Sequence, residues 1–196
     1  MDKDAPTEFA VHPLIMGRWS PRAFAERPVA DGEMRRLLEA ARWAPSCFNA
    51  QPWRFIVAPK RDAEGFEKLL GCLVEANRVW ARDAAVLMLS VAALDFAHDG
   101  SPNRHALHDV GLAAAQLTLQ AQDLGLRVHQ MAGFDPARAI EVFNIPERHQ
   151  PVAALALGYP GDPESLPEEL KKRELASRER TPQFEFAFSG AWGRAF

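Results

Sequence analysis

Cysteine is scarce in this chain, and basic residues are not in excess. The 196 residues include two cysteines, Cys47 and Cys72, which form neither a metal-binding spacing nor a disulfide framework. A reducing compartment is therefore expected, and we interpret the protein as cytoplasmic. The net charge of −3 gives no excess of positive charge with which to bind the phosphates of a nucleic acid.

Long hydrophobic runs and nucleotide-binding glycine motifs are also missing. The longest apolar stretch, Ala84 to Leu94 with one serine, is too short to cross a bilayer. The start, Met1-Asp2-Lys3-Asp4, lacks the basic-then-apolar layout of a signal peptide, so we expect no membrane partner. Neither G-x-G-x-x-G nor G-x-x-x-x-G-K-[ST] occurs, and a Rossmann-type nucleotide site has no support.

What is present fits one compact domain. With 47% hydrophobic and 25% charged residues, the chain can bury a sizeable core as a single domain over 1–196, or as an intertwined protomer of a dimer. No internal repeat, low-complexity tract or linker divides it.

The segment from Arg18 to Phe24 reads R-W-S-P-R-A-F. If it is extended, side chains two positions apart share a face, so that Arg18, Ser20 and Arg22 point the same way. Two guanidiniums and a hydroxyl suit a terminal phosphate, which carries about −1.5 to −2 charges near neutral pH and is held well by arginine. A solvated basic stretch before a helix is the alternative.

Two prolines bound a second polar block, residues 46–51. They push their neighbours out of helical geometry, so this block is predicted to be a loop that leads into a strand over 53–57. Asn49 and Gln51 carry side-chain amides, each both donor and acceptor, as the pyrimidine edge of an isoalloxazine ring requires. An Asx turn could explain Asn49, but it does not explain Gln51.

Hydrophobic periodicity predicts helices and strands in alternation. The alternation lacks the regular βαβ rhythm of a doubly wound sheet, so we expect an α+β fold with a mixed sheet flanked by helices. The predicted helices cover about 31–43, 62–78, 103–125, 136–143 and 166–177, and the predicted strands cover 53–57, 85–91 and 151–157.

The predicted 103–125 helix is apolar around most of its circumference. Such a helix must be buried, and a single small domain seldom buries one completely. Near the end of the chain, Phe184, Phe186 and Phe188 follow the period of a one-sided strand and would form a large apolar patch if exposed. We therefore expect an intertwined homodimer with an exchanged C-terminal arm, about 181–196.

The two polar blocks resemble those of the nitroreductase family of FMN-dependent oxidoreductases. R-x-S-x-R-x-F, a helix, and A-P-S-x-x-N-x-Q-P-W occur here in the family's order. The resemblance covers almost the whole chain, because further matches are Asn77, D-V-G-L-A-A at 109–114, D-L-G-L at 123–126, H-Q-M-A-G-F at 129–134, A-L-G-Y-P at 156–160 and R-E-R-T-P-Q at 178–183.

The resemblance implies non-covalent FMN sites built across the dimer interface. It implies no catalytic side chain, because N5 of the flavin carries the reaction. No metal site is expected, because the one histidine pair with a metal-binding spacing lacks a third ligand. The cofactor-binding residues that it implies are Arg18, Trp19, Ser20, Arg22, Pro45, Ser46, Cys47, Asn49, Gln51, Asn77, Gln130, Met131, Gly133, Arg178 and Arg180.

The activity implied by the resemblance is a ping-pong cycle. NAD(P)H reduces the flavin and leaves, and a nitroaromatic, quinone or similar small acceptor takes its place. A cation should stabilise reduced flavin near N1 and O2, and Arg22 is the candidate, with phosphate binding as its competing role. Many relatives carry a basic residue three positions after the asparagine that corresponds to Asn77, where this chain has Trp80.

Two other classes stay open on the sequence. One is a flavin-binding or flavin-processing protein on the same fold, which would need a catalytic acid over the ring. The other is a dimeric module without cofactor, against which the intact polar motifs argue. His105 and His108 lie one helical turn apart, but no third metal ligand accompanies them.

Overall fold

The computed structural model describes residues 3–196. Its centre is a four-stranded sheet in the order β1-β2-β4-β3, in which each neighbouring pair is antiparallel. The strands are β1 (Trp53–Pro59), β2 (Val86–Ala93), β3 (Arg127–Met131) and β4 (His149–Gly158). The predicted α+β class is confirmed, but within the described residues the sheet is antiparallel and not mixed, because periodicity reports burial and not strand direction.

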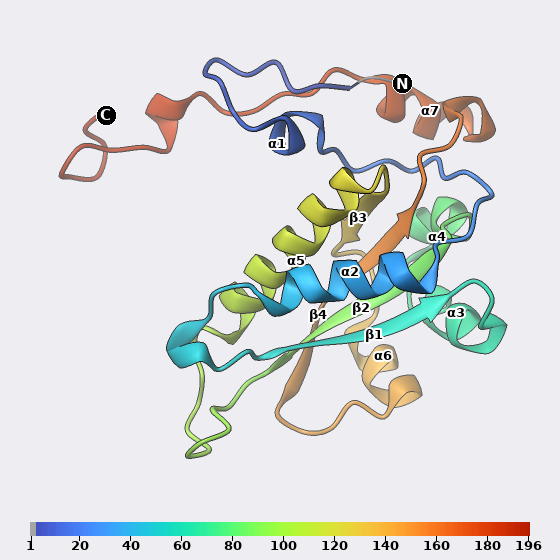
Figure 1. Cartoon of the computed structure of the whole chain (residues 1–196), viewed down its shortest axis with the longest axis horizontal. Coiled ribbons are helices and arrows are strands. Elements are labelled where there is room, and N and C mark those ends of the chain that lie inside the picture. The colour runs from blue at the N-terminus through green and yellow to red at the C-terminus, as the bar shows by residue number, and fades with distance from the viewer. Residues whose placement is uncertain (1–2) are drawn as a thin grey trace.

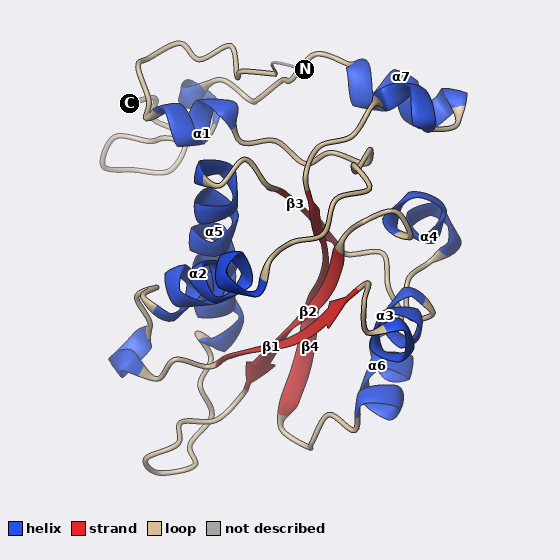
Figure 2. Ribbon diagram, turned by 45° about the vertical axis from the view of Figure 1, so that its right-hand side comes forward, coloured by secondary structure: helices blue, strands red, loops and turns tan. Residues whose placement is uncertain are grey.

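Helices cover both faces of the sheet (Figure 2). Helices α2 and α5 lie on one face, and α3, α4 and α6 lie on the other. Among residues 3–196 no helix is long and apolar enough to cross a membrane. The helices are α1 (Pro13–Gly17), α2 (Asp31–Arg42), α3 (Ala63–Leu70), α4 (Glu75–Ala81), α5 (Ala106–Asp123), α6 (Pro136–Phe143) and α7 (Glu168–Leu175).

Strand β2 lies between two hydrophobic clusters. Val86 and Met88 pack in the cluster on the α2 and α5 side, whereas Leu87 and Leu89 pack in the cluster on the α3 and α6 side. Helices cover both faces, so almost every position of β2 is buried. This double coverage explains why β2 reads as a continuous apolar run although its neighbours are antiparallel.

The helix predicted over 62–78 is interrupted. Leu73 forms an isolated β-bridge with Phe134, in the segment that follows β3, and separates α3 from α4. The bridge is a contact between distant parts of the chain, and the apolar pattern runs across it, so periodicity does not reveal the break. Asn77 consequently lies inside α4.

Helix α5 is buried on the side that faces the sheet and open on the other. Leu107 is 44% exposed, and Gly111 and Ala115 are exposed on the same outward side. Within one protomer, burial of this apolar helix is therefore one-sided, and its uncovered face carries small and apolar residues among polar ones such as His108 and Gln116.

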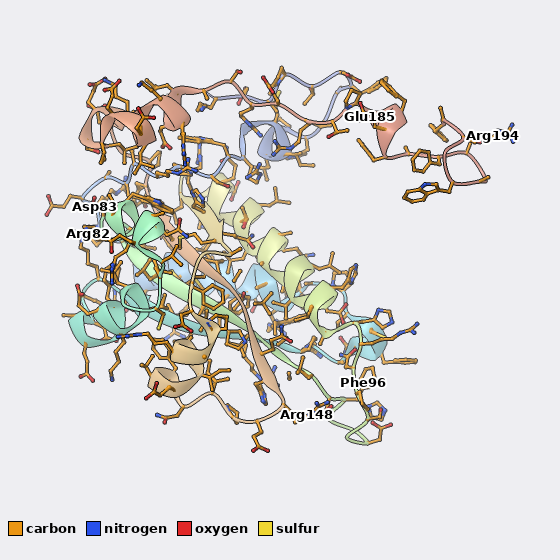
Figure 3. All side chains as sticks on the ribbon, turned by 180° about the vertical axis from the view of Figure 1, so that it is seen from behind. Arg82, Asp83, Phe96, Arg148, Glu185 and Arg194 are labelled. Atoms are coloured by element: carbon orange, nitrogen blue, oxygen red, sulfur yellow. The ribbon has the colours of Figure 1, made fainter. Side chains whose placement is uncertain are left out.

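The C-terminal segment leaves the body of the protein. After α7 it runs beside the N-terminal stretch and projects beyond α1 (Figure 1), and Glu185 and Arg194 lie on the projecting arm (Figure 3). Phe184 and Phe186 are 62% and 63% exposed. The strand predicted here is wrong, because the arm begins with a 3₁₀ turn and Phe188 forms a bridge only within the arm. A lone strand has no neighbour with which to pair its backbone.

Candidate functional site

Burial alternates along residues 18–23, as the period of two predicts, although the chain bends at Arg22. The outward-facing residues are Arg18, Ser20 and Arg22, and the buried ones are Trp19, Pro21 and Ala23. Arg18 Nη1 donates to Ser20 Oγ at 3.4 Å. Trp19 instead points inward, with Lys3 Nζ 5.1 Å from its ring centre, so only the backbone of Trp19 remains a candidate for a ligand on the outer face.

Three guanidiniums gather at this outer face, from Arg18, Arg178 and Arg180. Burial lowers the pKa of Arg18, and the nearby charges of Arg178 and Arg180 lower it further. The pKa of Arg178 is lowered by burial and by Arg180, an effect that Asp4 partly offsets. None of the three guanidiniums forms an ion pair with an acidic side chain of residues 3–196. Cations held together in this way favour an anionic ligand, which relieves their repulsion.

Arg178 donates hydrogen bonds to three backbone carbonyls. Its Nη1 donates to Lys3 O at 2.6 Å and to Met16 O at 2.7 Å, and its Nη2 donates to Arg18 O at 2.7 Å. These bonds occupy three of the five N–H donors of the guanidinium. Arg178 therefore ties three stretches of chain together, and the sequence does not predict this role.

The sequence also does not predict the buried carboxylate of Glu174. This side chain of α7 is 1% exposed, and it accepts hydrogen bonds from Arg22 N at 3.0 and 2.9 Å and from Ala23 N at 3.2 Å. The Arg22 guanidinium lies 3.9 Å away. The stretch E-E-L-K-K-R-E-L reads as a solvated charged helix, and the spacing of four from Leu170 is the one signal that Glu174 faces inward.

His129, on β3, contacts the segment 18–23 from its buried side. Its Nδ1 lies 2.8 Å from Pro21 O, to which the neutral imidazole donates, and its ring centre lies 4.5 Å from that of the buried Trp80. Burial lowers the pKa of His129 to about 4, against the opposing hydrogen bond to Pro21, and the charge of Arg22 adds to the lowering. The imidazole is therefore neutral at pH 7.

Acidification is expected to destabilise the protein through His129. The pKa of His129 is about 4 in the native state against an ordinary value of 6.5, so the unfolded state takes up the proton first as the pH falls. Stability from this group is complete above pH 6.5 and declines by about 3 kcal/mol as the pH approaches 4.

Urea unfolding at pH 7 and pH 4 measures this effect. His129→Gln, which binds no proton, should lose less stability than the wild type between the two pH values. The exposed His98→Gln is the matched control and should behave as the wild type. If the wild type and His129→Gln lost the same free energy of unfolding between pH 7 and pH 4, His129 would not be the source of the acid destabilisation.

The loop after α2 has an unusual backbone. Phe48, Asn49 and Gln51 have positive φ angles of 50°, 55° and 48°. For residues other than glycine this conformation costs roughly 1 kcal/mol or more each, and it persists where the surroundings fix it, often at binding sites. Phe48 is also 86% exposed.

Hydrogen bonds hold this loop at one end of α5. Asp109, a buried residue of α5, accepts from Cys47 N at 2.9 Å. Ser46 Oγ accepts from Gln51 N at 3.1 Å, and Gln51 Nε2 donates to Asn49 O at 3.1 Å. The Asn49 and Gln51 side chains are exposed, as is Pro45 just before them. The loop therefore presents polar amide groups on a fixed backbone.

Asn77 and Gly133, two further predicted site residues, are in contact. Asn77 Nδ2 donates to Gly133 O at 3.0 Å, and a Cβ at position 133 would come within 2.6 Å of that nitrogen. Gln130 is exposed, with Nε2 3.3 Å from Thr118 Oγ1. Met131 is 3% exposed and packs in the core, so its backbone alone can meet a ligand.

The two polar blocks lie at opposite ends of α5. Gly17 lies against Gln122, because a Cβ on Gly17 would meet the Gln122 amide at 2.6 Å, whereas Cys47 is bonded to Asp109. At a rise of about 1.5 Å per residue, these two points on α5 are about 20 Å apart. Figure 1 shows the turn between α2 and β1 at one end of α5 and α1 at the other. One protomer therefore does not bring the two blocks to a single ligand.

A groove of about 670 Å³ opens beside the arginine cluster. Its walls come from the N-terminal stretch between residues 5 and 11 and from the C-terminal segment between residues 178 and 186. Arg178 and Arg180 line it, so the cluster can be reached from solvent. None of its lining residues belongs to the loop 46–51, which agrees with the separation of the two blocks.

The two histidines at the start of α5, His105 at its N-cap and His108 in its first turn, contact different residues. Arg104 Nε lies 3.3 Å from His105 Nε2, whereas His108 Nδ1 lies 3.1 Å from Asp109 Oδ1. Within residues 3–196, no three side chains of His, Cys, Asp or Glu gather closely enough to hold a metal ion.

The chain is similar to known proteins over most of its length. The Nitroreductase family matches residues 15–159. An uncharacterised 15.4 kDa protein of Mycolicibacterium smegmatis is 39% identical over 147 residues, which cover 71% of this chain and 97% of the relative. A Streptomyces coelicolor protein, provisionally named an NADH dehydrogenase/NAD(P)H nitroreductase, is 32% identical over 72% of this chain and 78% of its own length.

A solved structure is similar over nearly the full length. A crystal structure described as an oxidoreductase containing FMN has a TM-score of 0.92 and 36% identity, and the match covers 97% of this chain and 96% of that one. The similarity extends past the family match into the C-terminal segment that carries Arg178 and Arg180. The chain belongs to the nitroreductase family.

Proposed function

We propose that the protein is a homodimeric FMN-dependent oxidoreductase that passes hydride from NAD(P)H to a nitroaromatic, quinone or similar small acceptor by a ping-pong mechanism. Its family and the relatives named above support an NAD(P)H-dependent oxidoreductase with FMN as cofactor. The acceptor class and the order of the two half-reactions are the parts that rest on family resemblance.

The arginine cluster is the observation that carries the proposal. Arg18, Arg178 and Arg180 bring three positive charges to one exposed face beside the Ser20 hydroxyl, and none of them forms an ion pair with an acidic side chain of residues 3–196. A phosphate monoester supplies the charge and the acceptor oxygens that such a set requires. The phosphate end of FMN fits this chemistry, and a neutral ligand would leave the repulsion uncompensated.

The separation of the two blocks supports a dimer. A second copy packed antiparallel against the outward face of α5 would bring its loop 46–51 to the segment 18–22 of the first copy. The two-fold relation would build the reciprocal site at the same time. Leu107, Gly111 and Ala115 offer the small and apolar surface that close packing of two helices needs.

When bound, FMN supplies the acceptance and donation of hydride at N5. Arg18, Ser20 and Arg180 would hold the phosphate, and the amides of Asn49 and Gln51 from the second copy would hydrogen-bond the pyrimidine edge of the ring. The backbone of the loop 46–51 does not need to rearrange when the ligand binds, because hydrogen bonds already fix it.

Arg22 is the residue to which we assign stabilisation of negative charge on the reduced ring. Trp80, at the position where many relatives have a basic residue, is buried with its ring centre 6.4 Å from that of Phe24 and 4.5 Å from that of His129. It supplies no charge. Arg22 is half-buried and its backbone is held by Glu174, which limits the positions that its guanidinium can take.

The visible spectrum of the purified protein tests the proposal. We expect bound flavin that NADH or NADPH bleaches under anaerobic conditions, and whose colour returns when a nitroaromatic or a quinone is added. Heat release of the chromophore should yield FMN and not FAD or riboflavin. A colourless protein that also fails to quench the fluorescence of added FMN would contradict the proposed function.

A further inference from the structure

The segment 174–178 lies beside the segment 18–22 in the opposite direction. Arg178 Nη2 donates to Arg18 O at 2.7 Å, and the Glu174 carboxylate accepts from Arg22 N at 3.0 and 2.9 Å. Both ends of the outward-facing segment are therefore held by side chains from one short stretch of the C-terminal region.

The charge at each end matches the backbone group that it meets. The anionic carboxylate of Glu174 accepts from N–H groups, and the cationic guanidinium of Arg178 donates to carbonyl oxygens. A carboxylate that is 1% exposed is tolerated only when it is well paired, and Glu174 has the N–H of Ala23 as well as that of Arg22. Charged groups bonded to backbone form stronger and more directional contacts than neutral ones.

Lys3, in the N-terminal stretch, makes further contacts with residues 174–178. Lys3 Nζ donates to Glu174 O and, at 2.8 Å, to Ala176 O, while Lys3 O accepts from Arg178 Nη1 at 2.6 Å. The N-terminal stretch thereby fixes residues 174–178, which in turn fix residues 18–22.

We infer that Glu174 and Arg178 are positioning residues of the phosphate site. They set the backbone of residues 18–22 so that Arg18 and Ser20 face one anion together with Arg180. Arg178 adds its charge to this site, but its hydrogen bonds go to backbone carbonyls and not to the anion. This inference rests on the proposed FMN site and changes the predicted role of Arg178 from a direct contact to an indirect one.

Two alternatives make different predictions for substitutions. If Arg178 bound the phosphate as a point charge, lysine would replace it, because lysine is also a common phosphate binder. If Glu174 only stabilised the fold, its replacement would weaken the binding of FMN and of riboflavin equally, because the two ligands differ only in the phosphate.

The test compares Arg178→Lys and Glu174→Gln with matched controls on α7. Lysine keeps the charge but cannot reach three carbonyls with a planar fork. Glutamine keeps the shape but places an amide donor against the N–H of Arg22. The controls are Arg173→Lys and Glu169→Gln, which make the same chemical changes at exposed positions.

Dissociation constants of FMN and riboflavin from the apoprotein, measured by flavin fluorescence, give the decisive ratio. Each test variant should weaken FMN by about tenfold or more. The dissociation constant of riboflavin from the test variants should stay within about threefold of the wild-type value. In the control variants, the dissociation constants of both FMN and riboflavin should stay within the same range.

The outcomes separate this inference from the proposed function. Unchanged FMN affinity in Arg178→Lys, or equal losses of FMN and riboflavin in Glu174→Gln, would overturn the positioning role and leave the FMN site standing. A wild-type protein that binds no FMN would overturn both. If Glu174→Gln does not fold, Glu174→Asp, which is too short to reach both N–H groups, decides by the same ratio.

Discussion

Replacing Arg18 by Ala is expected to weaken FMN binding by about 1.5–3 kcal/mol, which is roughly a 10- to 150-fold rise in Kd. Arg180→Ala should have a similar effect. The reason is that each guanidinium supplies charge-assisted hydrogen bonds to a phosphate that is otherwise held by few groups. Fluorescence titration of the apoprotein with FMN gives the affinities.

Riboflavin distinguishes a phosphate contact from a general defect. Its affinity should change little in Arg18→Ala and Arg180→Ala, because it has no phosphate to lose. Arg173→Ala removes the same charge from the exposed face of α7 and should leave both ligands unaffected. If riboflavin lost as much affinity as FMN, the phosphate assignment would be wrong.

Removal of the arm after Gln183 is expected to weaken both the dimer and the retention of flavin. The shortened chain keeps Arg178 and Arg180 but loses Phe184 and Phe186, whose exposed rings need a partner surface. An interface that covers the arms and α5 should exceed the standard size of about 1,600 Å² and leave little stable folded monomer.

Sedimentation and thermal unfolding over a range of protein concentrations test the dimer. The melting temperature of the full chain should rise with concentration, because association stabilises only the folded state. The exposed arm substitution Glu185→Gln is the control and should leave the dimer intact. A full-length monomer at micromolar concentration that holds its full complement of FMN would refute the shared site.

Local patterns predict the outer face of the candidate site well. The alternation at Arg18, Ser20 and Arg22 follows from the geometry of extended chain, which needs no tertiary contact to set it. Pro45 and Pro52 likewise mark the limits of the loop that carries Asn49, because proline restricts its own and its neighbour's backbone wherever it occurs.

Side chains that support the site from within are harder to predict. Glu174 stands among charged residues that are all favourable on a solvated helix, and its burial depends on N–H groups of a segment far away in sequence. His129 and Arg178 are similar cases, since each bonds to a backbone oxygen of a distant segment. Trp19 and Met131 show the converse, because a residue inside a binding motif can face the core.

Residue types and their spacing are enough to predict the family, the α+β class, the outward face of residues 18–22 and the apolar character of α5. Each of these is local, since it follows from residue type and spacing. The antiparallel sheet, the break before α4 and the separation of the two polar blocks by about 20 Å along α5 become visible only in the folded protein. These features depend on contacts between distant segments, whose free energy is not contained in any short stretch of chain.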